Sequence, residues 1–413
     1  MSQQTGKEVI YIGPRLFLEG FSEEFYGKLK ESCTRDNPAW FQWEALAKVK
    51  TWMKRKMTNP HSKHVHTFEL SREGMFVLRG FRKRVQELYP NARVVDLRVA
   101  PPASKPFVLA DTSLIPDDYQ LAGRDAAIKM ENCVLEAPTG AGKTFIAFLI
   151  TISLGLKTLF MVNTDVLAEQ TAAECRRILG IEPGLIKGDV NRIEDFTIAS
   201  IQSLATGRIE AMSKDWGLVI LDEGHMAAAD TFQYVLSKFY AKYVITVTGT
   251  PDDRSDRMGW LIYQSVGPKA WSVSSRELVA RGRIMGVTVN VIRSTAYNKE
   301  GHKWDPMEKT AHLKELIDCN ERNEEICDAL EDLVRAGHNV VAFTEIVDHA
   351  IWIHQEMSRR LPGVNPILYY GTMKPDSAKK KAYEDVKANR SMLTITTYKA
   401  AGTGLDEIGR AHV

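Results

Sequence analysis

The sequence predicts an α/β protein in which two lobes built on parallel sheets follow a small α+β domain. After residue 106, short β-branched apolar runs alternate with longer helical patterns, as is typical of parallel strands buried on both faces. These runs fall into two sets, separated by a connection near residues 273–301. A proline-rich break at Pro101–Pro106 sets off the preceding region. We therefore expect domains at residues 1–105, 106–275 and 276–413.

The region before the break has a distinctive charge. Residues 1–105 hold 19 Lys and Arg against 11 Asp and Glu, a surplus of +8, whereas the rest holds 35 against 41, or −6. Such a surplus attracts a polyanion, although it is equally typical of a solvated basic face. The expected helices are Phe21–Glu31, Ala39–Lys56 and Phe81–Leu88, and the expected strands are Val65–Leu70 and Met75–Leu78.

Basic and aromatic residues interleave in the second of these helices. Together they can grip phosphates and stack on exposed bases. The alternative is that the aromatic rings form the small domain's core and the lysines its wet face. The basic residues are Lys48, Lys50, Lys54, Arg55 and Lys56, and the aromatic ones are Trp40, Phe41, Trp43 and Trp52.

The two later sets of apolar runs are the expected parallel strands. In sheets of this kind, ligands bind at the carboxyl ends of the strands. The first set is Cys133–Glu136, Thr158–Val162, Phe196–Ala199, Leu218–Leu221 and Val244–Val247, and the second is Val340–Phe343, Pro366–Tyr369 and Leu393–Thr396.

Bulk properties narrow the class of protein. The 413 residues are 44% hydrophobic and 26% charged, which is ordinary for a soluble globular protein with more than one core. The longest apolar stretch, Phe145–Leu156, is shorter than the ~18 residues of a membrane span, and no secretory signal is evident. Five scattered cysteines without a Cys-x-x-Cys pair argue against a disulfide framework. We expect a cytoplasmic monomer without membrane association.

A glycine-rich segment follows the first strand of the first set and opens a helix. This is the context of a phosphate-binding loop, whose glycines let backbone N–H groups approach the phosphates at a helix N-terminus. Lys143 would pair with the β- and γ-phosphates, and Thr144 would hold Mg²⁺ through its hydroxyl. The ligands predicted are therefore ATP and Mg²⁺. The segment comprises Ala137, Pro138, Thr139, Gly140, Ala141, Gly142, Lys143 and Thr144.

An acidic pair ends another strand of the same set, in the segment Asp222-Glu-Gly-His225. Alone, such a pair is an ordinary strand end. When such a pair lies on its own strand downstream of a phosphate loop, we expect it to face the same crevice as that loop. Asp222 would then bind Mg²⁺, and Glu223 would orient and deprotonate the attacking water.

The order of these motifs resembles that of superfamily 2 helicases of the DEAD/DEAH type. The resemblance implies two RecA-like lobes, an ATP hydrolase that works on nucleic acid, and a catalytic role for His225 beside Lys143, Asp222 and Glu223. Thr248–Pro251 is similar to the family's third motif, which couples hydrolysis to lobe movement. Tyr119 and Gln120 resemble its adenine-reading motif.

Further segments resemble the family's motifs that face nucleic acid. The implied chemistry is hydroxyl, amide and backbone N–H contacts to phosphates, although Ser and Thr at strand ends are also common helix caps. In the fifth motif, Thr396–Asp406, the resemblance also places Gly404 and Asp406 near ATP. The residues implied to contact nucleic acid are Thr164, Ser200, Gln202, Thr344 and Thr397.

The C-terminus departs from the family pattern. Gly409-Arg-Ala-His-Val413 resembles the start of the sixth motif, which would make Arg410 an arginine finger. It arrives three residues after Asp406, where the family places a strand and a helix, and Val413 stands where a second arginine belongs. We expect either a truncated chain or an omitted segment.

Residues 68–84 resemble the domain that precedes the motor in phage UvsW-like helicases. This implies a branched or forked DNA partner, possibly single-stranded, in branch migration and recombination, with Lys54, Arg55 and Lys56 among the contacts. For a phage protein the location would be the host cytoplasm. The alternatives are an RNA helicase, a restriction-type motor subunit, or a DNA clamp that ATP switches without turnover.

Overall fold

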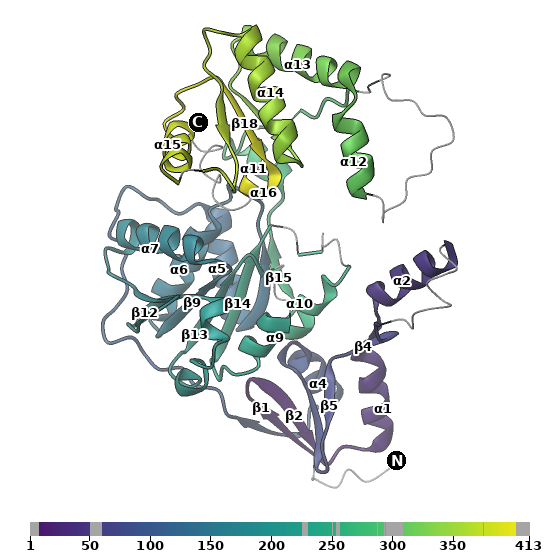
Figure 1. Cartoon of the computed structure of the whole chain (residues 1–413). Coiled ribbons are helices and arrows are strands. Elements are labelled where there is room, and N and C mark those ends of the chain that lie inside the picture. The colour runs from purple at the N-terminus through teal and green to yellow at the C-terminus, as the bar shows by residue number, and fades with distance from the viewer. Residues whose placement is uncertain are drawn as a thin grey trace. The chain divides into compact units, whose positions relative to one another are not determined.

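The computed structural model divides the chain into two compact units, Met1–Gly286 and Val287–Val413 (Figure 1). The structure describes residues 8–49, 60–224, 230–249, 251–252, 257–286, 288–292, 294, 309–374 and 376–401. The first unit contains two separate sheets, each with its own apolar core. The finer division at residues 105 and 275 stays a prediction.

The N-terminal sheet has the strand order β5-β6-β2-β1-β7. Its strands are β1 (Val9–Ile12), β2 (Arg15–Glu19), β5 (Phe68–Leu70), β6 (Gly74–Leu78) and β7 (Arg93–Asp96). β1 and β7 are parallel, and the other neighbours are antiparallel. One face packs against α1 (Glu23–Ser32) and α4 (Arg82–Leu88). A short antiparallel pair, β3 (Thr34–Asp36) with β4 (His64–His66), and helix α2 (Pro38–Val49) complete the region.

The aromatic residues of α2 lie outside this core. The buried cluster is formed by residues such as Ile10, Leu16 and Phe25, and it includes neither Trp40 nor Phe41 nor Trp43. The Phe41 side chain is 42% exposed. The alternative in which the rings form the small domain's core is therefore wrong for these three, because the alternating strand residues supply that core instead. Trp52 lies outside the described residues.

The eight-stranded sheet has the order β11-β10-β12-β9-β13-β14-β8-β15 and is parallel except for the edge strand β11. This confirms the predicted α/β class. The five strands of the first predicted set are present, with ends that shift by no more than one residue. The strands are β8 (Asn132–Glu136), β9 (Thr158–Val162), β10 (Gly184–Lys187), β11 (Val190–Arg192), β12 (Phe196–Ser200), β13 (Leu218–Asp222), β14 (Tyr243–Thr248) and β15 (Lys269–Ser272).

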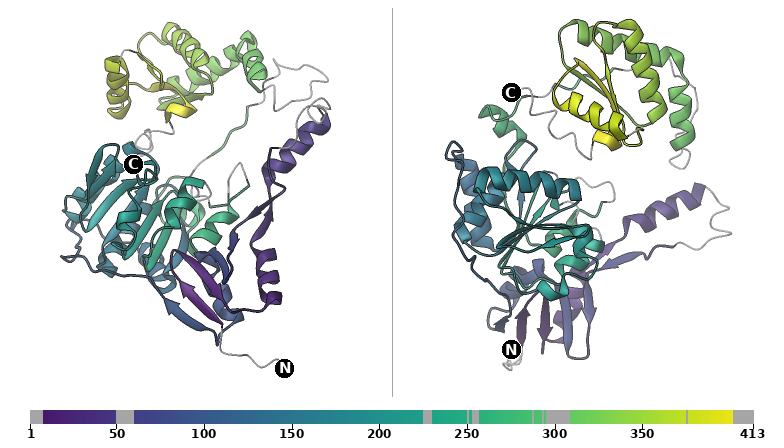
Figure 2. Two further views of the ribbon diagram at one scale, coloured as in Figure 1. Left: turned by 60° about the horizontal axis from the view of Figure 1, so that its bottom comes forward. Right: turned by 60° about the vertical axis from the view of Figure 1, so that its left-hand side comes forward.

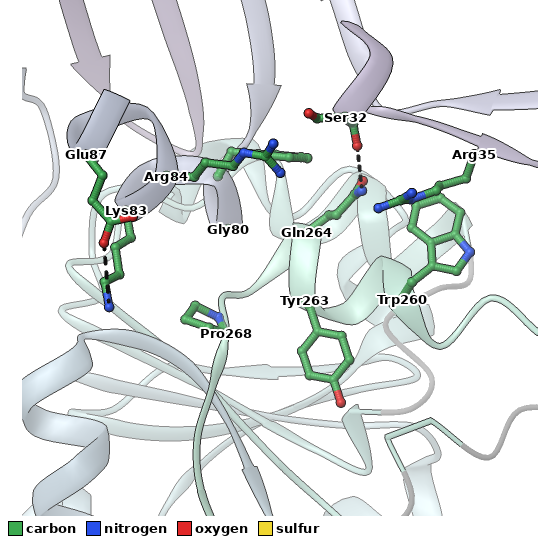
Figure 3. A pocket seen from close by; sticks show the side chains of 11 residues that line it. Ser32, Arg35, Gly80, Lys83, Arg84, Glu87, Trp260, Tyr263, Gln264 and Pro268 are labelled. Atoms are coloured by element: carbon green, nitrogen blue, oxygen red, sulfur yellow. Dashed lines mark hydrogen bonds and ion pairs between the residues drawn. The ribbon is translucent and has the colours of Figure 1, made fainter. Parts of the chain in front are cut away.

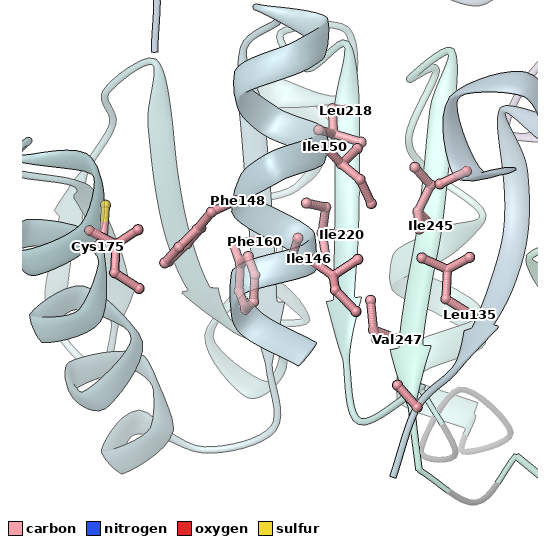
Figure 4. Packing of buried hydrophobic residues seen from close by; sticks show 14 of the residues in the cluster. Leu135, Ile146, Phe148, Ile150, Phe160, Cys175, Leu218, Ile220, Ile245 and Val247 are labelled. Atoms are coloured by element: carbon pink, nitrogen blue, oxygen red, sulfur yellow. The ribbon is translucent and has the colours of Figure 1, made fainter. Parts of the chain in front are cut away.

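Helices cover both faces of this sheet (Figures 1 and 2). Along β13, Leu218 and Ile220 join one apolar cluster, while Val219 and Leu221 join the other, as a strand buried on both sides requires. Figure 4 shows Ile146 and Ile150 against the strands on the first face. That face carries α5 (Asp118–Met130), α6 (Lys143–Leu154) and α7 (Asp165–Leu179), and the other carries α8 (Ile201–Leu204), η2 (Glu210–Met212), α9 (Asp230–Leu236) and α10 (Trp260–Ser265).

The two sheets of the first unit are joined by a buried arginine. Arg79, in the short 3-10 helix η1 (Arg79–Phe81), is 3% exposed and donates to four backbone carbonyls. Two belong to the N-terminal sheet's turn, Gly13 and Pro14, and two to the larger sheet's segment, Phe239 and Ala241. The predicted linker is also tied down, since Pro101 and Ala103 bond the backbone of Lys157 and Gly155.

The second unit has a three-stranded parallel sheet, ordered β16-β18-β17. Its strands are β16 (Val340–Thr344), β17 (Ile367–Tyr369) and β18 (Leu393–Thr397), as the second predicted set requires. Helices α12 (Lys309–Ile317), α13 (Asn320–Arg335), α14 (Val347–Arg360), α15 (Asp376–Lys387) and α16 (Tyr398–Ala401) accompany it, and α11 (Ser275–Ala280) lies before it, in the first unit.

Candidate functional site

The glycine-rich loop lies between β8 and α6, at the carboxyl edge of the large sheet. Gly140 and Gly142 have φ angles of +85° and +78°, a left-handed conformation that side chains rarely adopt. A Cβ on Gly142 would also come within 2.7 Å of Gln120 Nε2. α6 begins at Lys143, directly after the loop, so its first N–H groups are available to an anion. The loop therefore has the shape of a phosphate cradle.

The acidic pair of β13 meets this loop. Lys143 Nζ lies 2.6 Å from Glu223 Oε1, which forms an ion pair between residues 80 positions apart. The Glu223 N–H donates to Asp222 Oδ1 at 3.0 Å. Glu223 has a φ of +51°, which is uncommon for a residue with a side chain, so the backbone is strained where this carboxylate reaches Lys143. The structure thus brings Lys143, Asp222 and Glu223 together.

Burial changes the acidity of Asp222. Its pKa is raised from 3.8 to about 6, mainly because burial disfavours the charged form and also because the Glu223 carboxylate is close. The Lys143 cation opposes the rise. A nearby cation therefore stabilises the charged form of this carboxylate. The donor set fits Mg²⁺, which prefers carboxylate and hydroxyl oxygens, with Asp222 and the half-buried Thr144 as the residues that would hold it.

The third motif touches the same loop. The Ala137 N–H donates to the Thr248 carbonyl at 2.9 Å. A Cβ built on Gly249 would be 3.5 Å from the Ala137 carbonyl and 3.7 Å from Lys143 Nζ, so the Gly249 backbone lies beside both. A conformational change in the third motif would therefore move atoms that contact the phosphate loop.

The residues predicted to read adenine are bonded to the loop. Tyr119 Oη and Gln120 Nε2 both donate to the Ala141 carbonyl, at 3.0 and 3.2 Å. Gln120 Oε1 accepts from the Asp117 N–H at 3.0 Å, which forms a capping box at the start of α5. Both ends of the Gln120 amide are thus engaged within the protein, and its contact with adenine stays a prediction.

A segment that sequence reasoning missed lies over this region. Arg281 pairs with Asp118 and lies 5.7 Å from the centre of the Tyr119 ring, and Arg283 pairs with Asp117. Ile284 Cγ2 would be 2.7 Å from a Cβ on Gly140. These residues fall inside the stretch that the sequence predicts only as a connection, and no motif marks them.

The hydroxyls predicted to face nucleic acid mostly serve local structure. Thr164 caps α7 by accepting from the Leu167 N–H, and the Thr397 hydroxyl accepts from the Ala400 N–H. Ser200 is fully buried and donates to Ser203 Oγ. Thr344 is buried and donates to the Ile346 carbonyl. Gln202 is exposed. Nucleic-acid contacts of these residues stay predictions.

Seven predicted site residues lie outside the described residues: His225, Arg410, Gly404, Asp406, Lys54, Arg55 and Lys56. Within the described part of the chain, no cluster of His, Cys, Asp and Glu has the makeup of a metal site. Among the described helices, none has the length and apolar character needed to cross a bilayer.

The fold and the site define a P-loop NTPase, with a phosphate loop and an acidic pair on neighbouring parts of one parallel sheet. The family model described as "Type III restriction enzyme, res subunit" matches residues 114–253. The DNA 3'-5' translocase XPB2 of Sulfurisphaera tokodaii is 28% identical over 214 residues, which are 52% of this chain and 48% of that protein. With the order of the motifs, these matches support a superfamily 2 helicase. The chain spans about half the length of that curated relative.

One solved structure supports the fold. The Hef helicase domain of Pyrococcus furiosus has a TM-score of 0.50 at 15% identity, covering 72% of this chain and 88% of that one. T4 UvsW has a TM-score of 0.49 at 12% identity, covering 96% of this chain and 81% of that one.

Proposed function

We propose that the protein is an ATP-dependent DNA helicase or translocase that remodels branched or forked DNA. The observation that carries the proposal is the meeting of Lys143, Glu223 and Asp222 at the edge of one parallel sheet, with the Lys143–Glu223 ion pair at 2.6 Å. The same residues hold the groups that phosphoryl transfer needs: a cation for the phosphates, a carboxylate for a metal ion and a carboxylate for water.

In the proposed mechanism, Lys143 exchanges the Glu223 carboxylate for phosphate oxygens when ATP enters the loop. This exchange frees Glu223 to orient a water molecule and accept its proton. Asp222 and Thr144 would hold Mg²⁺, and the ion would supply positive charge to neutralise charge that develops on the phosphates. Gly249, the third-motif residue beside Lys143 Nζ, then transmits the change in the loop to the rest of that motif.

DNA is the proposed partner. The basic surplus of residues 1–105 supplies attraction to phosphates. The aromatic residues of α2 lie outside the core cluster and Phe41 is exposed, which supports a stacking role for this basic region. The similarity to a protein named as a DNA translocase supports DNA as the partner. A cytoplasmic monomer, in the host cytoplasm if a phage encodes it, completes the proposal.

Three other functions compete with this one. The description of the matching family model favours the motor subunit of a restriction system. An RNA helicase has the same motor motifs and is another alternative. The Lys143–Glu223 ion pair also suits an ATP-switched DNA clamp, since Glu223 would have to leave Lys143 before it could act on water.

The decisive experiment compares ATP hydrolysis in the presence of forked DNA, duplex DNA, single-stranded DNA and RNA, and adds a branch-migration assay on a four-way junction. We expect forked DNA to stimulate most and Lys143→Ala to abolish turnover, with Lys129→Ala, an exposed lysine on α5, as the matched control. Glu223→Gln should bind ATP without cleaving it. DNA binding that responds to ATP without turnover would establish the clamp, and stimulation by RNA alone would establish an RNA helicase.

A further inference from the structure

A pocket of about 440 Å³ lies at the seam between the N-terminal sheet and α10, away from the phosphate loop. Its walls come mainly from three places in the chain: the end of α1 and β3 with Ser32 and Arg35, the η1–α4 segment with Lys83 and Arg84, and α10 with Trp260 and Tyr263. Figure 3 shows Arg84 and Arg35 on one side of the opening and Trp260 beside Arg35. None of the motor motifs includes these residues.

The seam is rigid, so the pocket is a built feature of the first unit. Arg79 bonds carbonyls on both sides of it. Gln264 accepts from the Thr67 hydroxyl at 2.6 Å and donates to the Ser32 carbonyl. Gly80 allows close packing, because a Cβ there would lie 2.0 Å from the Tyr263 carbonyl. Side chains on the two walls therefore keep a fixed spacing.

The pocket continues into a longer trough. A second hollow, of about 570 Å³, shares Arg35 and Trp260 with the first and extends to β3 and His64. Both hollows are open to solvent at exposed residues such as Arg35 and Arg84. A trough of this form suits an extended chain better than a compact metabolite.

The charge of the first pocket is positive. Lys83 is balanced by Glu87, whose carboxylate lies 3.8 Å away. Among the described residues, neither Arg35 nor Arg84 takes part in an ion pair. Guanidinium groups bind phosphate oxygens in a bidentate manner, and they also stack on flat rings. Trp260, the half-buried first residue of α10, supplies an indole ring to the same lining.

We propose that this trough binds a single strand of DNA, with Arg35 and Arg84 on its phosphates and the Trp260 ring against a base. A single strand fits better than a duplex, because the bases of a duplex are stacked on one another and offer no free face to an indole. The proposal rests on the proposed function, since it gives the motor a second contact with its substrate.

The trough is connected to the motor. Tyr263, which lines the first hollow, donates its hydroxyl to the Asp252 carboxylate, with oxygen distances of 3.0 and 3.1 Å. Asp252 directly follows the third motif. Burial, and after it the hydrogen bond to the Asp252 carboxylate, raises the pKa of the Tyr263 hydroxyl. A Cβ on Gly259, just before α10, would lie 2.8 Å from the Pro251 carbonyl. A strand in the trough therefore touches the helix that packs on the third motif.

Binding of a fluorescent oligothymidylate of about 12 nucleotides, measured by anisotropy without ATP, tests the proposal. Trp260→Ala should weaken binding about 5-fold or more, the low end of the effect of base–aromatic stacking, and Trp260→Phe should restore most of it. Arg35→Ala with Arg84→Ala should lower the slope of log affinity against log salt by about 1.4, or roughly 0.7 for each lost phosphate contact. Arg72→Ala, an exposed arginine on the β5–β6 turn, is the matched control.

All variants should keep the wild-type melting temperature and the ATPase rate measured without DNA. Should Trp260→Ala unfold, the arginine pair and a photo-crosslink from a 5-iodouracil strand to Trp260 in the wild-type protein still decide. Wild-type affinity in both the Trp260 and arginine variants, equal losses for a blunt duplex, or an equal loss in Arg72→Ala would overturn the proposal. Because binding to the trough is measured without ATP, the trough proposal can fail while DNA-stimulated ATP hydrolysis remains normal. Conversely, the trough can bind DNA while the protein hydrolyses no ATP, in which case only the proposed function fails.

Discussion

Replacing Arg79 with methionine should loosen the joint between the two sheets of the first unit. The Arg79 side chain is 3% exposed, and its Nη2 donates to the Phe239 carbonyl at 2.7 Å and to the Gly13 carbonyl at 3.0 Å. The bonds to Pro14 and Ala241 are longer, at 3.3 and 3.4 Å. Methionine fills similar space but donates nothing, so these buried carbonyls lose their partner.

The two short bonds set the size of the effect. A buried acceptor left without a donor costs about 1–3 kcal/mol. Two such carbonyls give a loss of about 3 kcal/mol in the free energy of unfolding, once the relief from no longer burying a charge is set against them. In a unit of this size each kcal/mol lowers the melting temperature by about 2–4 °C, so we expect a drop of about 6 °C or more.

Thermal unfolding followed by circular dichroism measures this drop, and limited proteolysis reports whether the N-terminal sheet has separated. Arg72→Met, at an exposed position of the same region, should change stability by less than about 0.5 kcal/mol. Arg79→Lys should fall between the two, because an ammonium cannot span all four carbonyls. An Arg79→Met protein that melts within about 2 °C of the Arg72→Met control would refute the reasoning.

Three other predictions follow from local geometry. Because the Asp222 pKa is about 6, its carboxyl takes up a proton as the pH falls through 6, so ATP hydrolysis at limiting Mg²⁺ should decline there. Steady-state ATPase assays measure this decline. A rate that does not change between pH 5 and 7 would contradict the role of Asp222 in binding Mg²⁺. Gly224→Ala would place a Cβ 1.7 Å from Thr246 Oγ1, so we expect loss of ATPase activity and a lower melting temperature, whereas Gly27→Ala, with open space, should have neither effect. In the second unit, Arg359 and Arg360 hold the pKa of Glu356 at about 2, below its usual 4.5. The stability that this carboxylate contributes is therefore present above pH 4.5 and lost as the pH falls toward 2. In an acid titration followed by circular dichroism, Arg360→Met should lose less stability across that window than wild type.

The strands of the large sheet were predictable because their signal is local. β9 and β13 consist of continuous apolar residues buried on both faces, and such runs differ sharply from the helices between them. The phosphate loop was predictable for a similar reason, since its glycines, Lys143 and Thr144 are consecutive. That Lys143 and Glu223 face one crevice was predicted from motif order, but their direct ion pair was not, and the left-handed backbone of Glu223 has no sequence signal.

The N-terminal sheet was predicted only in part. β1 and β2 alternate buried and half-buried residues around Gly13-Pro14, a period-two pattern with a turn that was available in the sequence and was missed. The expected strand Val65–Leu70 divides into β4 and β5, because Thr67 bonds the Cys33 carbonyl rather than continuing a ladder. The seam and the Arg281–Ile284 segment depend on contacts between residues far apart in the chain, which no local pattern reports.

The contacts around Ala141 connect the two ends of the predicted nucleotide site. Its carbonyl accepts from both Tyr119 and Gln120, so the helix that would meet the adenine is bonded to the loop that would meet the phosphates. Asp117 and Asp118, at the start of that helix, pair with Arg283 and Arg281. Ile284, one residue further, packs on Gly140. A base that draws Gln120 away from Asp117 or Ala141 would therefore alter the loop and the segment that follows α11 together, because the same few hydrogen bonds hold both.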